Sequence, residues 1–236
     1  MSSRRKLIVN ADDFGLSAGI NQGIVQAHDA GIVTSASLMV YQPAATEAVA
    51  LARSRPLLSL GLHIDIGEWR YERGHWIPVY ERARQDDPLA LEASIVEQLE
   101  LFRRLTGAGP THLDSHQHVH KRDPVRSIVC PLADRLGVPL RHFNPHVFYC
   151  CDFYGQDEEG HSLAEHVTTS FLVNIIETLQ DGVTELGCHP AASLDFQSTY
   201  CQERREELQV LCSPVVVEAL ERERVLLASF ANISSF

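Results

Sequence analysis

Imidazole and carboxylate side chains are concentrated in one short segment, residues 112–120. In an extended chain the even-numbered side chains of this segment project to one side, because successive residues of a strand point to opposite faces. We therefore expect a shared polar face formed by His112, Asp114, His116, His118 and His120. Such a face is too polar for a core, and it is typical of a metal or acid–base site rather than of a solvated loop.

Three weaker signals lie elsewhere in the chain. The adjacent carboxylates Asp12 and Asp13 repel each other unless positive charge lies beside them, and they could equally form an Asx turn or cap a helix. His63 interrupts an apolar strand-like run, whereas His189 precedes Pro190, which ends a strand. Taken singly, each of these residues is compatible with a purely structural role.

Together these groups form the ligand set of a divalent metal ion with an open coordination position. Carboxylate and neutral imidazole favour Zn²⁺ or a similar ion, whereas Mg²⁺, which stays an alternative, prefers more oxygen ligands. Such an ion polarises a carbonyl and acidifies a bound water. A second carboxylate can then accept a proton while a histidine donates one to the leaving group. The pattern predicts a hydrolase of an amide or an ester.

Strand-like and helix-like segments alternate along the chain and must position these groups. Short β-branched runs predict the strands, and apolar residues at helical spacing predict the helices. Repeated βα units require a mostly parallel sheet, either a barrel or a doubly wound sheet. The expected strands are 6–11, 32–40, 57–66, 111–114, 184–188 and 225–230, and the expected helices are 17–31, 43–54, 91–105, 124–136, 163–180 and 202–222.

The positions of the polar residues favour the barrel. Asp12, Asp13, His63, the segment 114–116 and His189 come at or just after the C-terminal ends of expected strands. In a (β/α) barrel those ends converge on one face and form the active site. We therefore predict an α/β fold, an irregular TIM-like (β/α) barrel, as a single domain over residues 1–236. The absence of a GxGxxG motif after the first strand argues against a dinucleotide-binding sheet.

The composition is that of an ordinary globular protein with an acidic surface. Of its 236 residues, 44% are hydrophobic, and 20 Lys and Arg against 31 Asp and Glu give a net charge of −11. This charge repels phosphate backbones and anionic lipid, so we expect neither nucleic acid nor a membrane as a partner. The six cysteines form no CxxC pair, and the apolar run after the basic start is too short for a signal peptide. We expect reduced cysteines in a cytoplasmic protein.

Several motifs resemble one known family. They are LIVNADDFGLS at 7–17, GIVTS at 31–35, GLH at 61–63, THLDSHQHVH at 111–120, LGCHP at 186–190 and YCQERREEL at 200–208. Together they resemble the YdjC-like carbohydrate deacetylases, a family that includes the chitooligosaccharide deacetylases. The first and fourth motifs are long and specific.

The resemblance implies an irregular (β/α) barrel and a hydrolase that removes an acetyl group from an N-acetylated sugar, with a metal-bound water as the nucleophile. By their positions in the motifs, Asp13, His63 and His116 would hold one divalent metal ion, Zn²⁺ or Mg²⁺ or a similar ion. The same resemblance implies that Asp12 is the general base and that His189 is the general acid. The partner it implies is a small N-acetylated sugar, and whether the chain forms a homodimer stays open.

Some residues near these motifs have no settled role. His118 and His120 are candidates for contacts with the substrate or behind the metal ligands, and Asp114 could orient a ligand imidazole. The family usually has Gly after its His-Pro, whereas this chain has Ala191. If the backbone there needs a positive φ, the Cβ adds strain that could shift His189.

The segment 68–80 is rich in aromatic residues and holds Trp69, Tyr71, Trp76 and Tyr80. Aromatic faces stack on sugar rings, so one interpretation is a substrate-binding loop. The other is hydrophobic packing of a long loop onto the barrel.

Two other functions stay open at the level of the sequence. Another metal-dependent hydrolase on the same barrel, an amide deacylase or a phosphoesterase, would use the same ligands. A catalytically inactive sugar-binding relative is the alternative from a different class, which the presence of all five inferred site residues disfavours.

Overall fold

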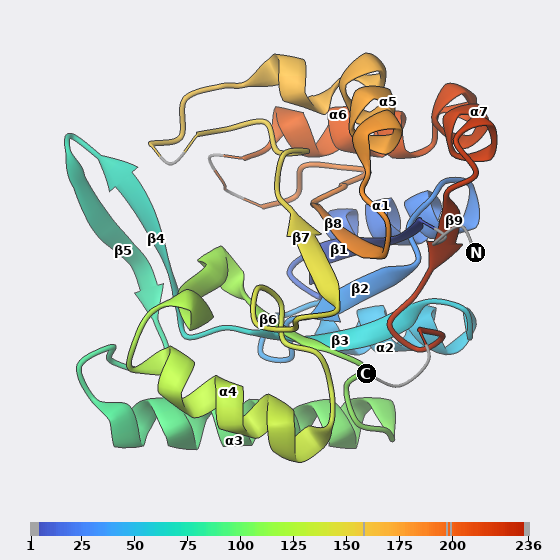
Figure 1. Ribbon diagram of the computed structural model, residues 1–236. Helices are drawn as coiled ribbons and strands as arrows, with labels where there is room; N and C mark the ends of the chain where they lie inside the picture. Colours follow the sequence, from blue (N-terminus) through green and yellow to red (C-terminus); the bar gives the residue numbers. More distant parts are fainter. Residues whose placement is uncertain (1–4, 158, 197, 199, 234–236) are drawn as a thin grey trace.

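A curled sheet of parallel strands forms the centre of the molecule (Figure 1). The computed structural model describes residues 5–157, 159–196, 198 and 200–233. Within them a seven-stranded sheet has the order β6-β3-β2-β1-β8-β7, and β9 also pairs with β1. Its strands are β1 (Lys6–Phe14), β2 (Ser35–Leu38), β3 (Ser59–Ile64), β6 (Leu113–Ser115), β7 (Val147–Cys150), β8 (Val183–Cys188) and β9 (Leu226–Ala228).

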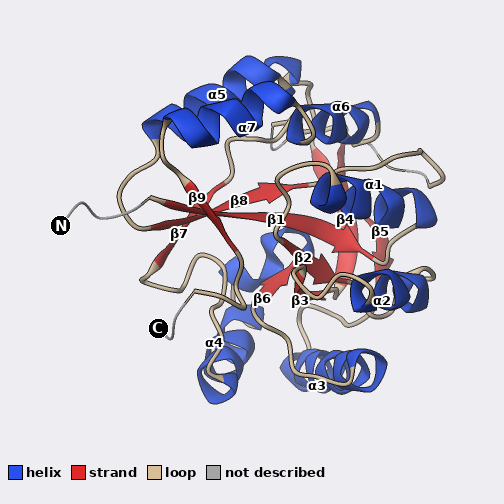
Figure 2. Cartoon of the chain, turned by 90° about the vertical axis from the view of Figure 1, so that its right-hand side faces the viewer, coloured by secondary structure: helices blue, strands red, loops and turns tan. Residues whose placement is uncertain are grey.

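Helices surround the outside of the curled sheet (Figures 1 and 2). Ser17 begins the first of them by accepting a hydrogen bond from the backbone N–H of Ile20 at 3.2 Å, and Gly107, with a φ of 79°, ends the third. The α-helices are α1 (Ala18–Asp29), α2 (Ala45–Arg53), α3 (Pro88–Thr106), α4 (Val125–Leu136), α5 (Thr169–Thr178), α6 (Gln202–Leu211) and α7 (Pro214–Arg222), and two 3₁₀ segments are η1 (His116–Lys121) and η2 (Ala164–Val167).

The predicted alternation of strands and helices around a parallel sheet is confirmed. The closed TIM-like barrel is not, because the path of hydrogen-bonded strands ends at β6 on one side and at β7 on the other. The molecule is an α/β domain built on a parallel half-barrel. Among the described residues, no helix has the length and apolar character that a membrane span requires.

The inside of the half-barrel is layered from apolar to polar. Ile8 and Val147, near the N-terminal ends of β1 and β7, belong to a small apolar cluster that also contains Phe230. Alternation along β1 places Asn10 and Asp12 on the same face as Ile8, but closer to the C-terminal end of the strand. The opposite face of β1 packs in the main core. The interior is therefore polar at the end of the sheet where the sequence predicts the site.

Several segments differ from the expected elements. Residues 147–150, where no strand was expected, form β7, and the helix expected over 163–180 divides into η2 and α5. The aromatic segment forms a hairpin of β4 (Gly67–Glu72) and β5 (His75–Glu81), which projects from the body of the molecule (Figure 1). Trp69 packs against the core, whereas Trp76 is 56% exposed, so packing onto the barrel accounts only for the base of this hairpin. The helix expected over 202–222 divides into α6 and α7 because Pro214 has no backbone N–H to continue the first helix.

Candidate active site

The C-terminal end of β1 presents two carboxylates to different surroundings. Asp13 has a φ of 65°, in the left-handed region that few residues with a Cβ adopt, and the pairing register with β2 shifts between Ala11 and Phe14. This irregular backbone interrupts the strand alternation. Asp12 and Asp13 are both buried, but they contact separate sets of side chains.

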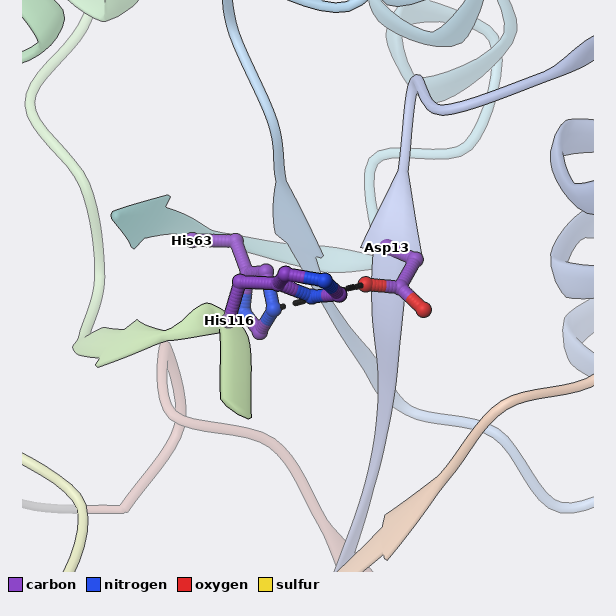
Figure 3. Close-up of side chains that lie close together, drawn as sticks. All are labelled: Asp13, His63 and His116. Atoms are coloured by element: carbon purple, nitrogen blue, oxygen red, sulfur yellow. Dashed lines mark hydrogen bonds and ion pairs between the residues drawn. The ribbon is translucent and has the colours of Figure 1, made fainter. Parts of the chain in front are cut away.

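Asp13 faces the imidazoles of His63 and His116 (Figure 3) and also contacts the guanidinium of Arg204. Its Oδ1 lies 3.1 Å from His116 Nδ1 and 3.5 Å from His63 Nε2. Its Oδ2 accepts a hydrogen bond from Arg204 at 2.6 Å. Burial raises the pKa of Asp13, but Arg204 and the two imidazoles outweigh burial and hold the pKa well below its usual value. Asp13 is therefore an ionised carboxylate with one oxygen directed at the two histidines.

A hydrogen bond to Asp114 fixes the orientation of the His63 ring. Its Nδ1 donates a hydrogen bond to Asp114 Oδ1 at 2.7 Å, which leaves Nε2 directed at Asp13. Burial lowers the pKa of His63, but Asp114 and Asp13 together raise it well above its usual value. Burial likewise lowers the pKa of His116, and the nearby carboxylates of Asp13 and Glu68 raise it to about 9.

These three side chains fit a divalent metal ion. Asp13, His63 and His116 each offer a ligand atom, and these atoms all lie within 4.8 Å of one another. Ligands at the usual bond lengths of a tetrahedral Zn²⁺ are separated by about 3.3 Å, and the two measured separations from Asp13 Oδ1 are 3.1 and 3.5 Å. The carboxylate behind His63 is the support that a ligand imidazole commonly has. The predicted ligand set is thus brought together by the fold.

Asp12 is paired with the guanidinium of Arg141 rather than with that of Arg204. Arg141 donates hydrogen bonds from its two terminal nitrogens to Asp12 Oδ2 and Oδ1 at 2.6 and 2.7 Å, and Asn10 Nδ2 donates to Oδ1 at 2.9 Å. Arg141 also lies 2.8 Å from Asp114 and 2.6 Å from Glu185. Burial raises the pKa of Asp12, but Arg141 brings it below the usual value.

One guanidinium therefore faces three buried carboxylates. Burial raises the pKa of Glu185 to about 7, because the attraction of Arg141 is offset by repulsion from Asp114 and Asp12. Of these carboxylates, Glu185 is therefore the one whose ionised form is disfavoured, whereas the lowered pKa of Asp12 keeps Asp12 ionised.

His189 follows β8 and faces Asp12. Its Nε2 lies 3.8 Å from Asp12 Oδ2, and its Nδ1 lies 3.8 Å from Glu207 Oε1. Its backbone N–H donates to Glu207 Oε2. Ala191 is not among the described residues with a positive φ, so the strain considered for this position does not arise. Ala191 instead packs against α1, where a Cβ on Gly23 would come within 2.5 Å of its Cα.

The comparison with known families agrees with the motifs. The family described as YdjC-like protein matches residues 6–222. The chain belongs to the YdjC-like protein family. The resemblance inferred from the sequence motifs is thereby confirmed.

Relatives of this YdjC-like chain cover nearly its full length. A carbohydrate deacetylase of Geobacillus stearothermophilus is 38% identical over 245 residues, which are 96% of this chain and 97% of that protein. The crystal structure of an Enterococcus faecalis protein named for cellobiose-phosphate cleavage has a TM-score of 0.77 at 27% identity and covers 98% of this chain and 99% of its own. A peptidoglycan N-acetylglucosamine deacetylase shares the fold, with a TM-score of 0.61 at 10% identity over 100% of this chain and 90% of its own.

The histidine-rich segment of this YdjC-like protein does not form the single polar face that the sequence predicts. The strand ends at Ser115, and in η1 the residues Gln117 and His118 have φ values of 49° and 51°. The left-handed turn ends the alternation of side chains. Asp114 and His116 therefore face the site, whereas His118 and His120 do not continue the same strand face.

The other histidines of the segment pack around the site. His112 stacks on Phe230 with ring centroids 3.9 Å apart, and burial lowers its pKa to about 4. His120 is hydrogen-bonded to Ser115 Oγ and to the carbonyl oxygen of Arg141, and burial lowers its pKa to about 3. Both are neutral structural residues, so the direct contact with substrate considered for His120 is not supported. His118 lies edge-on to Tyr149, with ring centroids 5.4 Å apart.

Three residues of the site were not found from the sequence: Arg141, Arg204 and Glu207. A signal for the two arginines existed, because adjacent carboxylates need positive charge beside them. The chain offers many arginines, however, and only the fold selects the one that reaches each carboxylate. Arg204 and Glu207 both lie in the motif at 200–208 that carries the family resemblance, so a signal marked this segment, although it assigned no role to either residue.

Proposed function

We propose that this chain is a metal-dependent hydrolase that removes an acetyl group from an N-acetylated sugar. The observation that carries the proposal is a pair of opposed proton-transfer groups, Asp12 and His189, beside the three-residue donor set of Asp13, His63 and His116. The carbohydrate deacetylase relative supports the choice of substrate class. A chain with a net charge of −11 also suits a neutral sugar better than an anionic substrate.

Asp13, His63 and His116 would hold the ion. When bound there, a divalent ion such as Zn²⁺ supplies polarisation of the acetyl carbonyl and a lowered pKa for water. Asp114 keeps the Nε2 of His63 directed at the ion by accepting the proton of Nδ1.

Asp12 serves as the proton acceptor. Arg141 and Asn10 donate to its two oxygens and so fix the plane of the carboxylate. Its low pKa keeps it ionised at neutral pH. Asp12 Oδ2, which faces His189, accepts the proton of the attacking water.

His189 serves as the proton donor to the leaving amine. Its Nε2 faces the site, while Glu207 lies behind its Nδ1 and holds its backbone N–H. Tyr200 donates its hydroxyl proton to Glu207 and so orients that carboxylate. Transfer of a proton to the nitrogen breaks the amide bond and releases the amino sugar together with acetate.

The test is an acetate-release assay on the purified, Zn²⁺-loaded protein. We expect acetate from N-acetylglucosamine or its oligomers, loss of release with a chelator, and recovery when Zn²⁺ is restored. A generic phosphate ester assayed in parallel should release no phosphate. Phosphate release without acetate would identify a phosphoesterase, and inactivity of the metal-loaded protein on all acetylated sugars would identify a sugar-binding relative.

A further inference from the structure

Arg204 connects the candidate metal ligand Asp13 with the candidate proton donor His189. It lies near the start of α6, is 4% exposed, and donates to Asp13 Oδ2 at 2.6 Å. Its other nitrogens donate to the carbonyl oxygens of His189 at 3.3 Å and of Tyr200 at 3.0 Å. A single guanidinium thus touches the side chain of a candidate metal ligand and the backbone of the candidate proton donor.

The contact with Asp13 determines which oxygen is free. Because Oδ2 accepts from Arg204, only Oδ1 is directed at His63 and His116. The other nitrogens of the guanidinium are held by the carbonyl oxygens of His189 and Tyr200, so the nitrogen that donates to Oδ2 has a fixed position and limits rotation of the carboxylate. Asp13 is thereby prepared to bind an ion through one oxygen.

The contact with His189 belongs to a wider attachment of α6. The backbone N–H of Ala191 donates to the carbonyl oxygen of Arg204 at 3.1 Å. Glu207, one turn further along the helix, accepts from the backbone N–H of His189. Both sides of the His189 backbone are therefore held by α6, and Arg204 extends the same attachment to Asp13.

We propose that Arg204 is a positioning residue that fixes Asp13 and His189 as one unit, so that the metal ligand and the proton donor keep a constant relative placement. The proposal rests on the function proposed above for these two residues. It assigns to Arg204 a role that is exerted through Asp13 and His189.

The adjacent residue provides a matched control. Arg205 has the same side chain and lies on the same helix, but it is exposed. A helix turns by about 100° per residue, so only one of the two arginines can point at Asp13. A general effect of positive charge on α6 would be shared by both residues, whereas a positioning effect belongs to Arg204 alone.

The experiment measures Zn²⁺ affinity by calorimetry, without substrate, on chelator-treated protein. We expect Arg204→Gln to weaken Zn²⁺ binding by about 10–100-fold, the usual effect of losing a group that orients a metal ligand. Arg204→Lys should weaken it less, because Lys retains one donor for Asp13. Arg205→Gln should bind Zn²⁺ within about twofold of the unmodified protein, since its side chain is solvated.

A second readout addresses His189. At saturating Zn²⁺, the Arg204→Gln variant should lose kcat for acetate release, with less change in KM, because the proton donor is displaced. Arg204→Lys, which keeps the charge and one donor, serves as the decisive variant if Arg204→Gln does not fold, and circular dichroism checks that it is native.

Two outcomes would overturn the proposal. Unchanged Zn²⁺ affinity in folded Arg204 variants would remove the positioning role. Stronger Zn²⁺ binding in Arg204→Gln would show that Arg204 acts only as a repelling charge, because loss of a cation by itself strengthens the binding of a divalent ion. Failure of the unmodified protein to release acetate would contradict the proposed function, but it would leave the Zn²⁺ comparison decisive for Arg204.

Discussion

Asp12 and Asp13 have the same side chain, adjacent positions and similar burial, yet their surroundings differ. Both oxygens of Asp12 accept hydrogen bonds from Arg141, which it shares with two further carboxylates, Asp114 and Glu185. Asp13 gives one oxygen to Arg204 and turns the other to two imidazoles. Asp12 is therefore suited to accept a proton in a fixed position, and Asp13 is suited to bind an ion.

The difference shows how a fold gives neighbouring identical residues separate surroundings. The left-handed backbone at Asp13 turns the two side chains apart. Arginines from distant parts of the chain, the segment after α4 and the start of α6, then stabilise each one separately. The expected consequences are described below from the largest effect to the smallest.

Substitution of each aspartate should have a different effect. Asp13→Ala removes a ligand, so we expect Zn²⁺ binding to be lost in calorimetry. Asp12→Asn should bind Zn²⁺ but lose turnover by about 10²–10⁴-fold, the usual contribution of a proton-transfer group. Near-normal acetate release by Asp12→Asn would contradict its assignment as the base.

Removal of Arg141 should destabilise the fold strongly. Arg141→Leu leaves three buried carboxylates without their cation, and we expect the free energy of unfolding at pH 7 to fall by about 3–5 kcal/mol in urea denaturation. The control is Arg55, which donates from Nε to Asp29 Oδ1 and from Nη2 to Asp29 Oδ2 in a comparable ion pair at the surface. Arg55→Leu should cost about 1 kcal/mol or less, and equal costs for the two variants would contradict the interpretation.

The excess charge around Arg141 should make stability depend on pH through Glu185. Its folded pKa of about 7 lies above the usual 4.5, so the folded protein binds this proton more tightly, and its contribution to stability is lost as pH rises from 4.5 to 7. Glu185→Gln removes this titration while keeping an acceptor for Arg141. Between pH 5 and pH 8 the variant should gain roughly 2–3 kcal/mol relative to the unmodified protein.

Urea denaturation of both proteins at the two pH values measures this gain. Titrations elsewhere in the chain cancel in the comparison. A difference between the two proteins that is the same at pH 5 and pH 8 would show that Glu185 does not carry the excess charge.

On the Asp13 side, metal binding should compete with protons. Without a bound ion, the pKa of His116 is raised to about 9 and that of His63 is also raised, so both imidazoles hold protons at pH 7. An imidazole must lose a proton before it can bind the ion. Zn²⁺ affinity should therefore fall about tenfold for each unit by which the pH is lowered, for each proton released on binding. Calorimetry in buffers of different ionisation enthalpy counts these protons; equal affinity at pH 6 and pH 8 would contradict the prediction.

Much of the molecule could be predicted from local signals. The βα alternation, the parallel sheet and the grouping of Asp12, Asp13, His63, His116 and His189 at the strand ends follow from short-range patterns. The prediction that the histidine segment shares one face was wrong, because the left-handed residues of η1 interrupt the strand. No pattern in the sequence predicts these left-handed residues. The single domain over 1–236 and the cytoplasmic location stay predictions, and whether the chain forms a homodimer stays open.

The sequence by itself determined the family, the kind of sheet and the residue types of the site, because strand ends and motif spacing are local properties of the chain. Only the tertiary structure decided which arginine pairs with which aspartate, and why Ala191 is accommodated after Pro190. It also decided that the sheet stays a half-barrel. For the arginines the physical reason is that a buried charge must be paired, and the partner that pairs it is selected by distance in space rather than along the chain. For Ala191 and the sheet the reason is likewise spatial, because the space beside Gly23 and the pairing of strands depend on segments that are distant in the sequence.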